Sequence, residues 1–421
     1  MLQENAIQDY LANYEPAFER QVSFYDESPL PTAVETKVID GIPVTYYTNQ
    51  FWTARQRQAS SIHEISYRAC FKPQLPLFFI ELFTGRGDLV YDPFSGRGTT
   101  AVEAALSGRR VAANDVNPLS RILTEPRLEM PEEIEITKRL DHIDLSPTLA
   151  PDLDLSMFYH PDTEKELLAL RLYLQGREAA NKSDCCDRWI RMVATNRLSG
   201  HSKGFFSVYT MPPNQAVTPE RQVKINLKLG QAPDYRDVKN IIKRKTGQLL
   251  KKVTAVEKER LREAAKSALY LENDAAHTPE IETGSVALTV TSPPFLNIVQ
   301  YSKDNWLRCW FNSIDMTAVE KKITMASSLV EWSGIMAAVL KELFRITKPG
   351  GWVAFEVGEV RKGRLMLEEA IVPLATACGF KCPGVIINRQ DFTKTSNIWG
   401  VDNNRLGTNS NRIVLLVKEP L

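Results

Sequence analysis

The stretch "GDLVYDPFSGRGTTAVEAALSGRRVAANDVNP", residues 87–118, decides the fold of this chain. It begins with an apolar run that ends at Asp92, passes through a glycine-rich turn into a helix-forming segment, and closes with a second apolar run before Asp115. Strand, turn, helix and strand in this order predict a βαβ unit. Because the crossover of such a unit joins parallel strands, the stretch predicts a parallel sheet.

The same alternation returns in the C-terminal part of the chain. A long helix that stops at Pro-Gly-Gly is predicted over residues 328–351, and a pair of amphipathic helices is predicted upstream, over residues 63–83. Further strands are predicted at 267–273, 285–291, 352–359, 384–388 and 411–418. We therefore expect an α/β fold with a doubly wound, mostly parallel sheet.

Composition and charge exclude several classes of protein. The 421 residues are 43% hydrophobic, and the chain shows neither a signal peptide at its start nor an apolar run long enough to span a bilayer, so we expect a cytoplasmic protein with no membrane partner. The six cysteines lack metal-ligand spacing, and no metal site is expected. The net charge is +1, yet residues 221–266 hold 14 Lys or Arg against 5 Asp or Glu, a local +9. Such a segment is typical of either a solvated helix face or a nucleic-acid-binding surface.

The glycine-rich turn predicts a ligand site. Gly96, Gly98 and Ala101 fit the pattern G-x-G-x-x-G/A, and Asp115 ends the next strand, where it is placed to bind ribose hydroxyls. On these residues alone, a nicotinamide dehydrogenase would be a reasonable interpretation. No Lys follows the glycines, which excludes a Walker loop. The two threonines that open the helix suit a carboxylate as well as a phosphate.

A second motif, "TSPPF" at residues 291–295, stops a buried strand abruptly. Consecutive prolines stiffen the turn and restrict the residues before them. The Ser292 hydroxyl and the Pro293 carbonyl can then accept both hydrogens of an amino group at the carboxyl edge of the sheet, and Phe295 offers an aromatic surface for stacking.

Together, "DPFSGRGTT" and "TSPPF" resemble the motifs DPFxGxGTT and (S/D/N)PP(Y/F) of the S-adenosylmethionine-dependent DNA amino-methyltransferases. The resemblance implies a class I methyltransferase fold, S-adenosylmethionine as cofactor, and direct methyl transfer to a flipped base. It implies catalytic roles for Ser292, Pro293, Pro294 and Phe295. It implies cofactor contacts from Phe71, Pro73, Asp92, Phe94, Gly96, Gly98, Thr99, Thr100, Asp115 and Asp274. Ser-Pro-Pro members act mostly on cytosine N4, so that base is favoured and adenine N6 stays open.

The resemblance also suggests how the chain is divided. Residues 61–120 and 266–421 would form the cofactor-binding catalytic domain, with an appended N-terminal lobe over 1–60 and an inserted, mainly helical target-recognition domain over 121–265. The insertion is far longer than a βαβ crossover needs.

Several contacts with duplex DNA are expected from this arrangement. Phosphate contacts are expected from Lys239, Lys243, Arg244 and Lys245, base-edge contacts from Arg197, His201 and Lys203, and a position near the base for Asn403, Asn409 or Asn411. A restriction endonuclease acting on the same site is a further expected partner, and DNA binding would associate the protein with a prokaryotic nucleoid. An RNA or protein-amide methyltransferase and a noncatalytic DNA-binding scaffold remain as alternatives.

Overall fold

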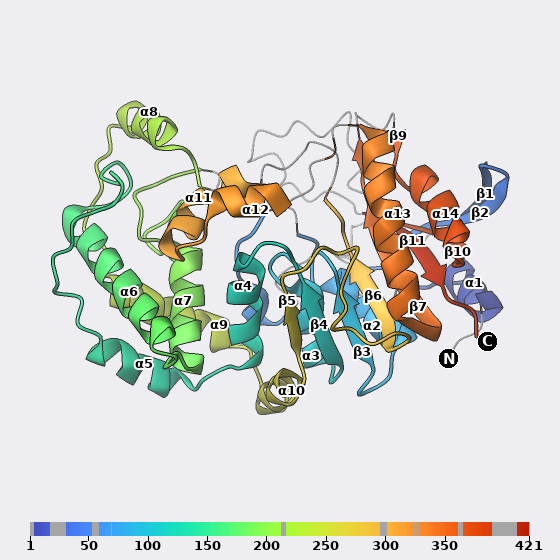
Figure 1. Cartoon of the computed structure of the whole chain (residues 1–421), viewed down its shortest axis with the longest axis horizontal. Coiled ribbons are helices and arrows are strands. Elements are labelled where there is room, and N and C mark those ends of the chain that lie inside the picture. The colour runs from blue at the N-terminus through green and yellow to red at the C-terminus, as the bar shows by residue number, and fades with distance from the viewer. Residues whose placement is uncertain are drawn as a thin grey trace, which may run out of the picture.

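A single large sheet forms the centre of the molecule (Figure 1). The computed structural model describes residues 4–16, 31–52, 59–68, 70–211, 216–294, 301–322, 326, 328–360, 365–389 and 411–420. The sheet has nine strands: β1 (Ala33–Ile39), β2 (Ile42–Asn49), β3 (Leu89–Asp92), β4 (Arg110–Asn114), β5 (Leu269–Leu271), β6 (Val286–Thr291), β7 (Thr347–Val357), β10 (Lys381–Asn388) and β11 (Asn411–Val417). Two short strands, β8 (Glu359–Val360) and β9 (Leu365–Met366), pair separately.

The strand order is β1-β2-β10-β11-β7-β6-β3-β4-β5. Strands β5, β4, β3, β6 and β7 are mutually parallel, whereas β11 is antiparallel to both β7 and β10. The chain winds outward from β3 through β4 to β5 and then crosses back to β6 on the other side of β3. The predicted doubly wound α/β fold is therefore confirmed. Its topological switch point lies between β3 and β6, where open sheets of this kind bind ligands.

Helices cover both faces of the sheet. Alternate residues of β7 divide between two cores: Trp352 and Ala354 belong to one, and Val353 and Phe355 to the other. This period of two is expected of a strand buried on both faces. The first face is covered by α1 (Glu4–Ala12), α2 (Gln74–Phe83) and α3 (Thr99–Leu106), and the second by α13 (Leu329–Ile346) and α14 (Glu368–Ala377).

The N-terminal residues extend the sheet. Strand β2 pairs in parallel with β10, and β1 pairs with β2 in an antiparallel hairpin. The Asn388 side-chain oxygen also accepts hydrogen bonds from the Phe51 and Trp52 backbone amides, at 2.7 and 3.2 Å. The described part of residues 1–60 thus differs from the appended lobe that was expected, because backbone pairing with a C-terminal strand incorporates it into the sheet.

Only the second half of the helix pair predicted over 63–83 forms a long helix, α2. A single 3₁₀ turn, Ser61–His63, precedes a segment without helix. The buried Arg97 side chain donates to the Ile65 carbonyl at 2.7 Å and to the Phe71 carbonyl at 3.3 Å. These two hydrogen bonds attach the residues before α2 to the glycine-rich turn.

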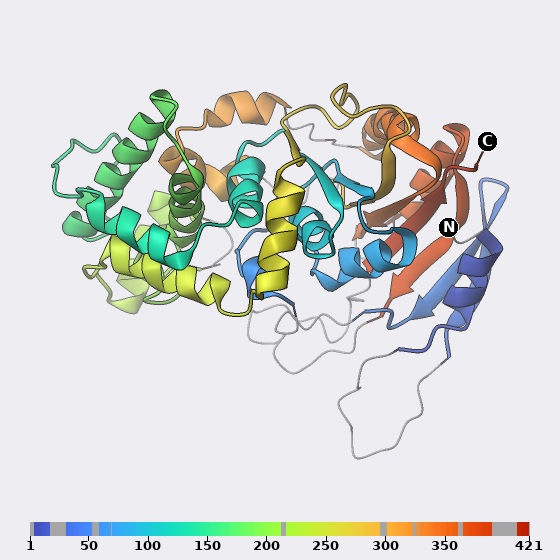
Figure 2. The same ribbon diagram turned by 90° about the horizontal axis from the view of Figure 1, so that it is seen from below.

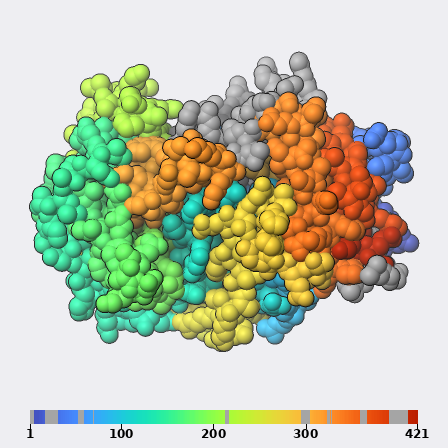
Figure 3. All heavy atoms as spheres, viewed as in Figure 1, coloured from blue at the N-terminus to red at the C-terminus, as the bar shows by residue number. Residues whose placement is uncertain are grey.

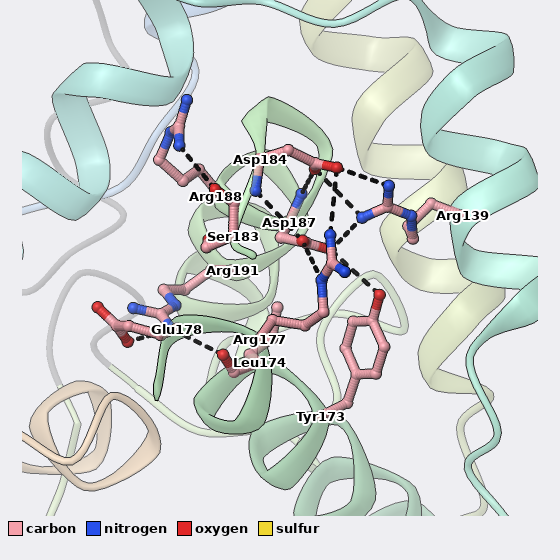
Figure 4. A network of polar contacts seen from close by, with 10 residues as sticks. All are labelled: Arg139, Tyr173, Leu174, Arg177, Glu178, Ser183, Asp184, Asp187, Arg188 and Arg191. Carbon is pink, nitrogen blue, oxygen red and sulfur yellow. Dashed lines mark hydrogen bonds and ion pairs between the residues drawn. The ribbon is translucent and has the colours of Figure 1, made fainter. Parts of the chain in front are cut away.

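A lobe of helices lies beside the sheet (Figure 2). The helical lobe comprises α5 (Glu133–His142), α6 (Pro161–Ala179), α7 (Cys185–Arg197), α8 (Pro219–Leu229) and α9 (Val238–Leu250), while α4 (Leu119–Leu128) and α10 (Ala255–Ala265) connect it to the sheet. Figure 4 shows how buried charge joins three of its helices. Asp187 on α7 accepts from Arg139 of α5 at 2.5 Å and from Arg177 of α6 at 2.8 Å, and Asp184 accepts from Arg139 at 2.6 Å.

Two helices that follow the second motif pack against the helical lobe. They are α11 (Tyr301–Phe311) and α12 (Met316–Lys322). Trp306 Nε1 donates to the Val217 carbonyl at 3.1 Å, and Asn312 Nδ2 donates to Thr195 Oγ1 at 2.9 Å. Chain from both sides of residue 266, the predicted end of the inserted domain, therefore meets in this lobe.

Among the described residues, no helix combines the length and apolar character needed to cross a bilayer.

Candidate functional site

A cavity of about 1080 Å³, including its open mouth, lies at the carboxyl ends of β3, β4, β5 and β6. Its walls come from both sequence motifs and from α13. The lining residues used below are Tyr67, Arg68, Phe71, Asp92, Phe94, Ser95, Gly96, Thr99, Asp115, Asp274, Ser292, Pro294, Lys322 and Trp332.

The glycine-rich turn packs too tightly for side chains at its second glycine. Gly96 and Gly98 have φ of +54° and +72°, values that favour glycine. A Cβ on Gly98 would lie 2.1 Å from Thr124 Oγ1 of α4. The turn is also fixed by the Ser95 amide, which donates to the Asn114 carbonyl at 2.9 Å. The sequence pattern therefore reflects both backbone conformation and close helix packing.

Asp115 closes the turn from the end of β4. Its Oδ2 accepts from the Gly96 amide at 2.8 Å, and its Oδ1 accepts from the Asn117 amide at 2.9 Å. Burial raises the pKa of Asp115 to about 6, although these two hydrogen bonds partly offset the effect. The carboxylate is thus oriented by the backbone on two sides and lines the cavity.

Asp92 joins the two strands at the switch point. Its Oδ1 accepts from Thr291 Oγ1 at 2.7 Å, which links the carboxyl end of β3 to that of β6, and also from the Phe94 amide at 3.1 Å. Burial raises the pKa of Asp92 to about 7 against these hydrogen bonds. The contact fixes the distance between the glycine turn and the diproline turn.

Glu356 on β7 is a buried carboxyl beside Ser292, and sequence reasoning missed it. The Ser292 hydroxyl and Asn411 Nδ2 both form hydrogen bonds with its carboxyl group. Burial raises the pKa of Glu356 to about 7. When Glu356 is ionised, it can only accept, so the Ser292 proton points toward it and the serine lone pairs are left for another donor.

Most of the predicted cofactor and catalytic residues lie on this cavity. Those that line it are Phe71, Asp92, Phe94, Gly96, Thr99, Asp115, Asp274, Ser292 and Pro294. Thr100 is instead buried and donates to the Val290 carbonyl at 3.0 Å, and Gly98 packs on α4. Pro293 is buried in the turn, and Phe295 lies outside the described residues. Pro73 lies on a separate hollow with Glu103 and Arg260, because it begins α2, which turns away from the cavity.

Sequence reasoning also missed residues that stabilise the turns. Arg97, within G-x-G, donates from Nε to Thr99 Oγ1 at 3.1 Å and so ties the turn to the Phe71 segment. Trp332 of α13 donates to the Pro294 carbonyl at 2.9 Å. A buried carboxylate within an apolar strand, as in "WVAFEVGE", was the available signal for Glu356.

The structure corrects two of the expected DNA contacts. Lys245 is only 6% exposed and faces Glu64 at 3.6 Å, because it lies on the packed side of α9. Arg197 is 8% exposed, with its guanidinium 3.9 Å from the centre of the Phe205 ring. Neither is placed to contact DNA. Two of the other candidates contact Asp141: Lys243 pairs with its carboxylate at 2.5 Å, and Lys239 contacts its carbonyl at 3.5 Å. Arg244 donates to the Lys203 carbonyl at 2.9 Å. The side chains of His201 and Lys203 are exposed.

The donor set of the cavity fits S-adenosylmethionine. Asp115 offers carboxylate oxygens for ribose hydroxyls, and Phe71 and Phe94 provide apolar walls. Ser95 Oγ lines the same cavity, is buried, and has no hydrogen-bond partner among the described residues, so it is available to a polar ligand group. No cluster of three His, Cys, Asp or Glu suited to a metal ion occurs in the described part of the chain.

Comparisons with known proteins point in one direction. A family model described as DNA methylase matches residues 32–124. Type II methyltransferase M.MjaII from Methanocaldococcus jannaschii is 32% identical over 75 residues, covering 18% of this chain and 14% of the relative. Type II methyltransferase M.BsoBI from Geobacillus stearothermophilus is 24% identical over 328 residues, covering 69% of this chain and 60% of the relative.

A solved structure, a SAM-dependent methyltransferase from Methanosarcina mazei, has 12% identity and a TM-score of 0.32 over 82% of this chain and 98% of that chain. The chain spans less than two thirds of the length of each curated relative described above. The matched segment contains the glycine turn and Asp115, which meet the diproline turn on one cavity. This chain is thus similar to a family model described as DNA methylase and to Type II methyltransferases, and the similarity does not distinguish cytosine-N4 from adenine-N6 members.

Proposed function

We propose that this chain transfers a methyl group from S-adenosylmethionine to the exocyclic N4 of cytosine in duplex DNA. The observation that carries the proposal is the shared cavity: Gly96 and Asp115 line it together with Ser292 and Pro294. Donor and acceptor groups can thus lie side by side. Bound there, S-adenosylmethionine would supply an electrophilic methyl group. The proposal includes a restriction-modification setting, with an endonuclease that cleaves the same site.

The chemistry requires an activated amino nitrogen. The lone pair of an exocyclic amino group is delocalised into the base ring, so the nitrogen is a weak nucleophile. Ser292 Oγ and the Pro293 carbonyl would accept its two hydrogens and orient its lone pair toward the methyl group. The nitrogen–methyl bond would form as the sulfur–methyl bond breaks, the thioether would leave with that electron pair, and one amino proton would be released to solvent. Ionised Glu356 would hold the Ser292 proton away from the substrate. The cytosine must leave the helix to reach this cavity, and base flipping supplies that access.

The first test is the identity of the modified base. DNA from cells that express the chain is expected to contain N4-methylcytosine, measured by nucleoside mass spectrometry against cells that carry the empty vector. N6-methyladenine alone would favour the second candidate, an adenine-N6 methyltransferase with the same cavity. If neither base appears and purified protein labels only RNA or protein, the DNA assignment is wrong.

The rate of methyl transfer is expected to rise with pH through an apparent pKa of about 7, the value to which burial raises the pKa of Glu356. Below that pH the carboxyl is protonated and no longer acts only as an acceptor for the Ser292 hydroxyl. Glu356→Gln removes the titration, so the rate is expected to fall about tenfold at neutral pH and to lose this limb, because one hydrogen bond to a charged group is lost. Initial rates of label transfer to duplex DNA measure both effects.

The matched control is Asp92→Asn, because burial also raises the pKa of Asp92 to about 7. At saturating cofactor this variant should keep the pH limb. A limb that disappears in Asp92→Asn and persists in Glu356→Gln would assign the titration to the wrong carboxyl and refute the role given to Glu356.

A further inference from the structure

Helix α8 projects from the helical lobe with most of its surface in solvent (Figure 3). The Thr218 side chain caps its first turn, and Gly230 ends it in the left-handed conformation. Polar anchors hold its inner side: Gln222 Nε2 donates to the Tyr209 carbonyl at 3.0 Å, and Asn226 Nδ2 donates to the Met157 carbonyl at 2.8 Å. The helix is therefore firmly attached along one side and free along the other.

The free side of α8 carries three cations beside the exposed apolar side chains of Val223, Leu227 and Leu229. Arg221, Lys224 and Lys228 are exposed, and Glu220 is the one acidic residue of the helix. In the described part of the chain, none of these three cations forms an ion pair with a carboxylate. Some cations elsewhere in the basic segment are paired with carboxylates: Lys258 and Arg262 pair with Glu132 at 2.8 and 2.6 Å. Among the described residues, α8 thus presents three exposed cations that have no carboxylate partner.

Contacts through α11 fix α8 relative to the cavity. The Ala216 amide, just before α8, donates to the Asp304 carbonyl at 2.9 Å. The Asp304 carboxylate in turn pairs with Arg68 at 2.6 Å, and Arg68 lines the cavity. In Figure 1, α8 lies at the upper edge of the molecule, and the carboxyl end of β6 points toward the same edge. A ligand large enough to contact α8 on that side would approach the cavity as well.

We infer that the exposed face of α8 formed by Arg221, Lys224 and Lys228 binds phosphates of the DNA duplex beside the flipped base. The three cations span eight residues, about 10 Å of helix, over which a duplex presents about six charges. The inference rests on the proposed function for its choice of DNA. The inference goes beyond the proposed function because it assigns the phosphate contacts to α8, whereas the sequence alone predicted them on α9.

The test compares two triple variants that remove the same charge. Arg221→Gln/Lys224→Gln/Lys228→Gln is expected to weaken binding to a fluorescent mixed-sequence duplex about tenfold or more. Its plot of log K against log salt should be shallower by about 2.7, because each lost phosphate contact removes about 0.9. The control, Lys239→Gln/Lys243→Gln/Lys266→Gln, should keep the wild-type slope. Cofactor affinity, measured by calorimetry, should be the same in all three proteins.

Three results would overturn the inference: an unchanged slope in the α8 variant, a larger loss of slope in the control, or no duplex binding by the wild-type protein. Methyl transfer by the wild-type protein separates this inference from the proposed function. A wild-type protein that binds duplex through α8 and transfers no methyl group would refute only the function. One that methylates DNA with no contribution from α8 would refute only the docking surface.

Discussion

Ser292→Ala is expected to lower the rate of methyl transfer at saturating cofactor by about 10² to 10³, the usual loss when one preorganised polar contact to a reacting group is removed. The variant lacks the oxygen that would accept an amino hydrogen. It also leaves Glu356 without the hydrogen bond that Ser292 provides, so that the pKa of this buried carboxyl should rise further. Single-turnover label transfer to duplex DNA measures the loss.

The matched control is Ser285→Ala, which removes a hydroxyl just before the opposite end of the same strand. Ser285 Oγ donates to the Glu282 carbonyl at 2.6 Å. This residue precedes the amino end of β6, whereas the diproline turn follows its carboxyl end. This variant should transfer methyl groups at the wild-type rate. Equal rates in wild-type protein and Ser292→Ala, with both proteins folded, would remove the serine from the mechanism.

Gly98→Ala is expected to lower the free energy of unfolding by about 2–5 kcal/mol. Alanine at a φ of +72° costs about 1–2 kcal/mol. Its Cβ would also lie 2.1 Å from Thr124 Oγ1, and overpacking of a buried site costs about 1–3 kcal/mol. Because the displaced turn carries Gly96 and contacts Asp115, cofactor affinity should fall with stability. Denaturant unfolding and calorimetry measure the two quantities.

Gly87→Ala separates the two contributions. Gly87 has a φ of +81° and no atom within 4 Å of an added Cβ, so this variant bears only the conformational cost, about 1–2 kcal/mol. Thr124→Ala removes two of the three overlapping atoms and should partly rescue Gly98→Ala in a double-mutant cycle. If Gly98→Ala and Gly87→Ala lower the free energy of unfolding equally, the overlap with Thr124 of α4 contributes nothing to the loss.

The centre of the sheet was predictable because its signals are local. The strand, turn and helix of residues 87–118 lie next to one another in the chain, and β6 is an apolar run ended by prolines. The place of β2 was not predictable, because it is decided by backbone pairing with β10, far away in the sequence. Local patterns give no information on which distant strand provides the partner.

The site divides in the same way. Gly96, Asp115 and Ser292 belong to short motifs, whereas Glu356 reaches Ser292 only because β6 and β7 pair with Thr291 opposite Phe355. The charge count of residues 221–266 indicates a basic segment and does not tell which of its cations are exposed. Helix packing turns Lys245 of α9 toward Glu64 and leaves Lys224 of α8 exposed, a difference that composition does not contain.

The joint construction of the helical lobe from two distant chain segments limits how specificity could be engineered. Val217 and Thr195 accept hydrogen bonds from Trp306 of α11 and from Asn312, which directly follows this helix. A graft of residues 121–265 into a relative would break these bonds and leave Trp306 and Asn312 without their partners. Under the predicted target-recognition role of the lobe, exchange of sequence preference would therefore require transplanting both segments together, as a composite and not as a portable cassette.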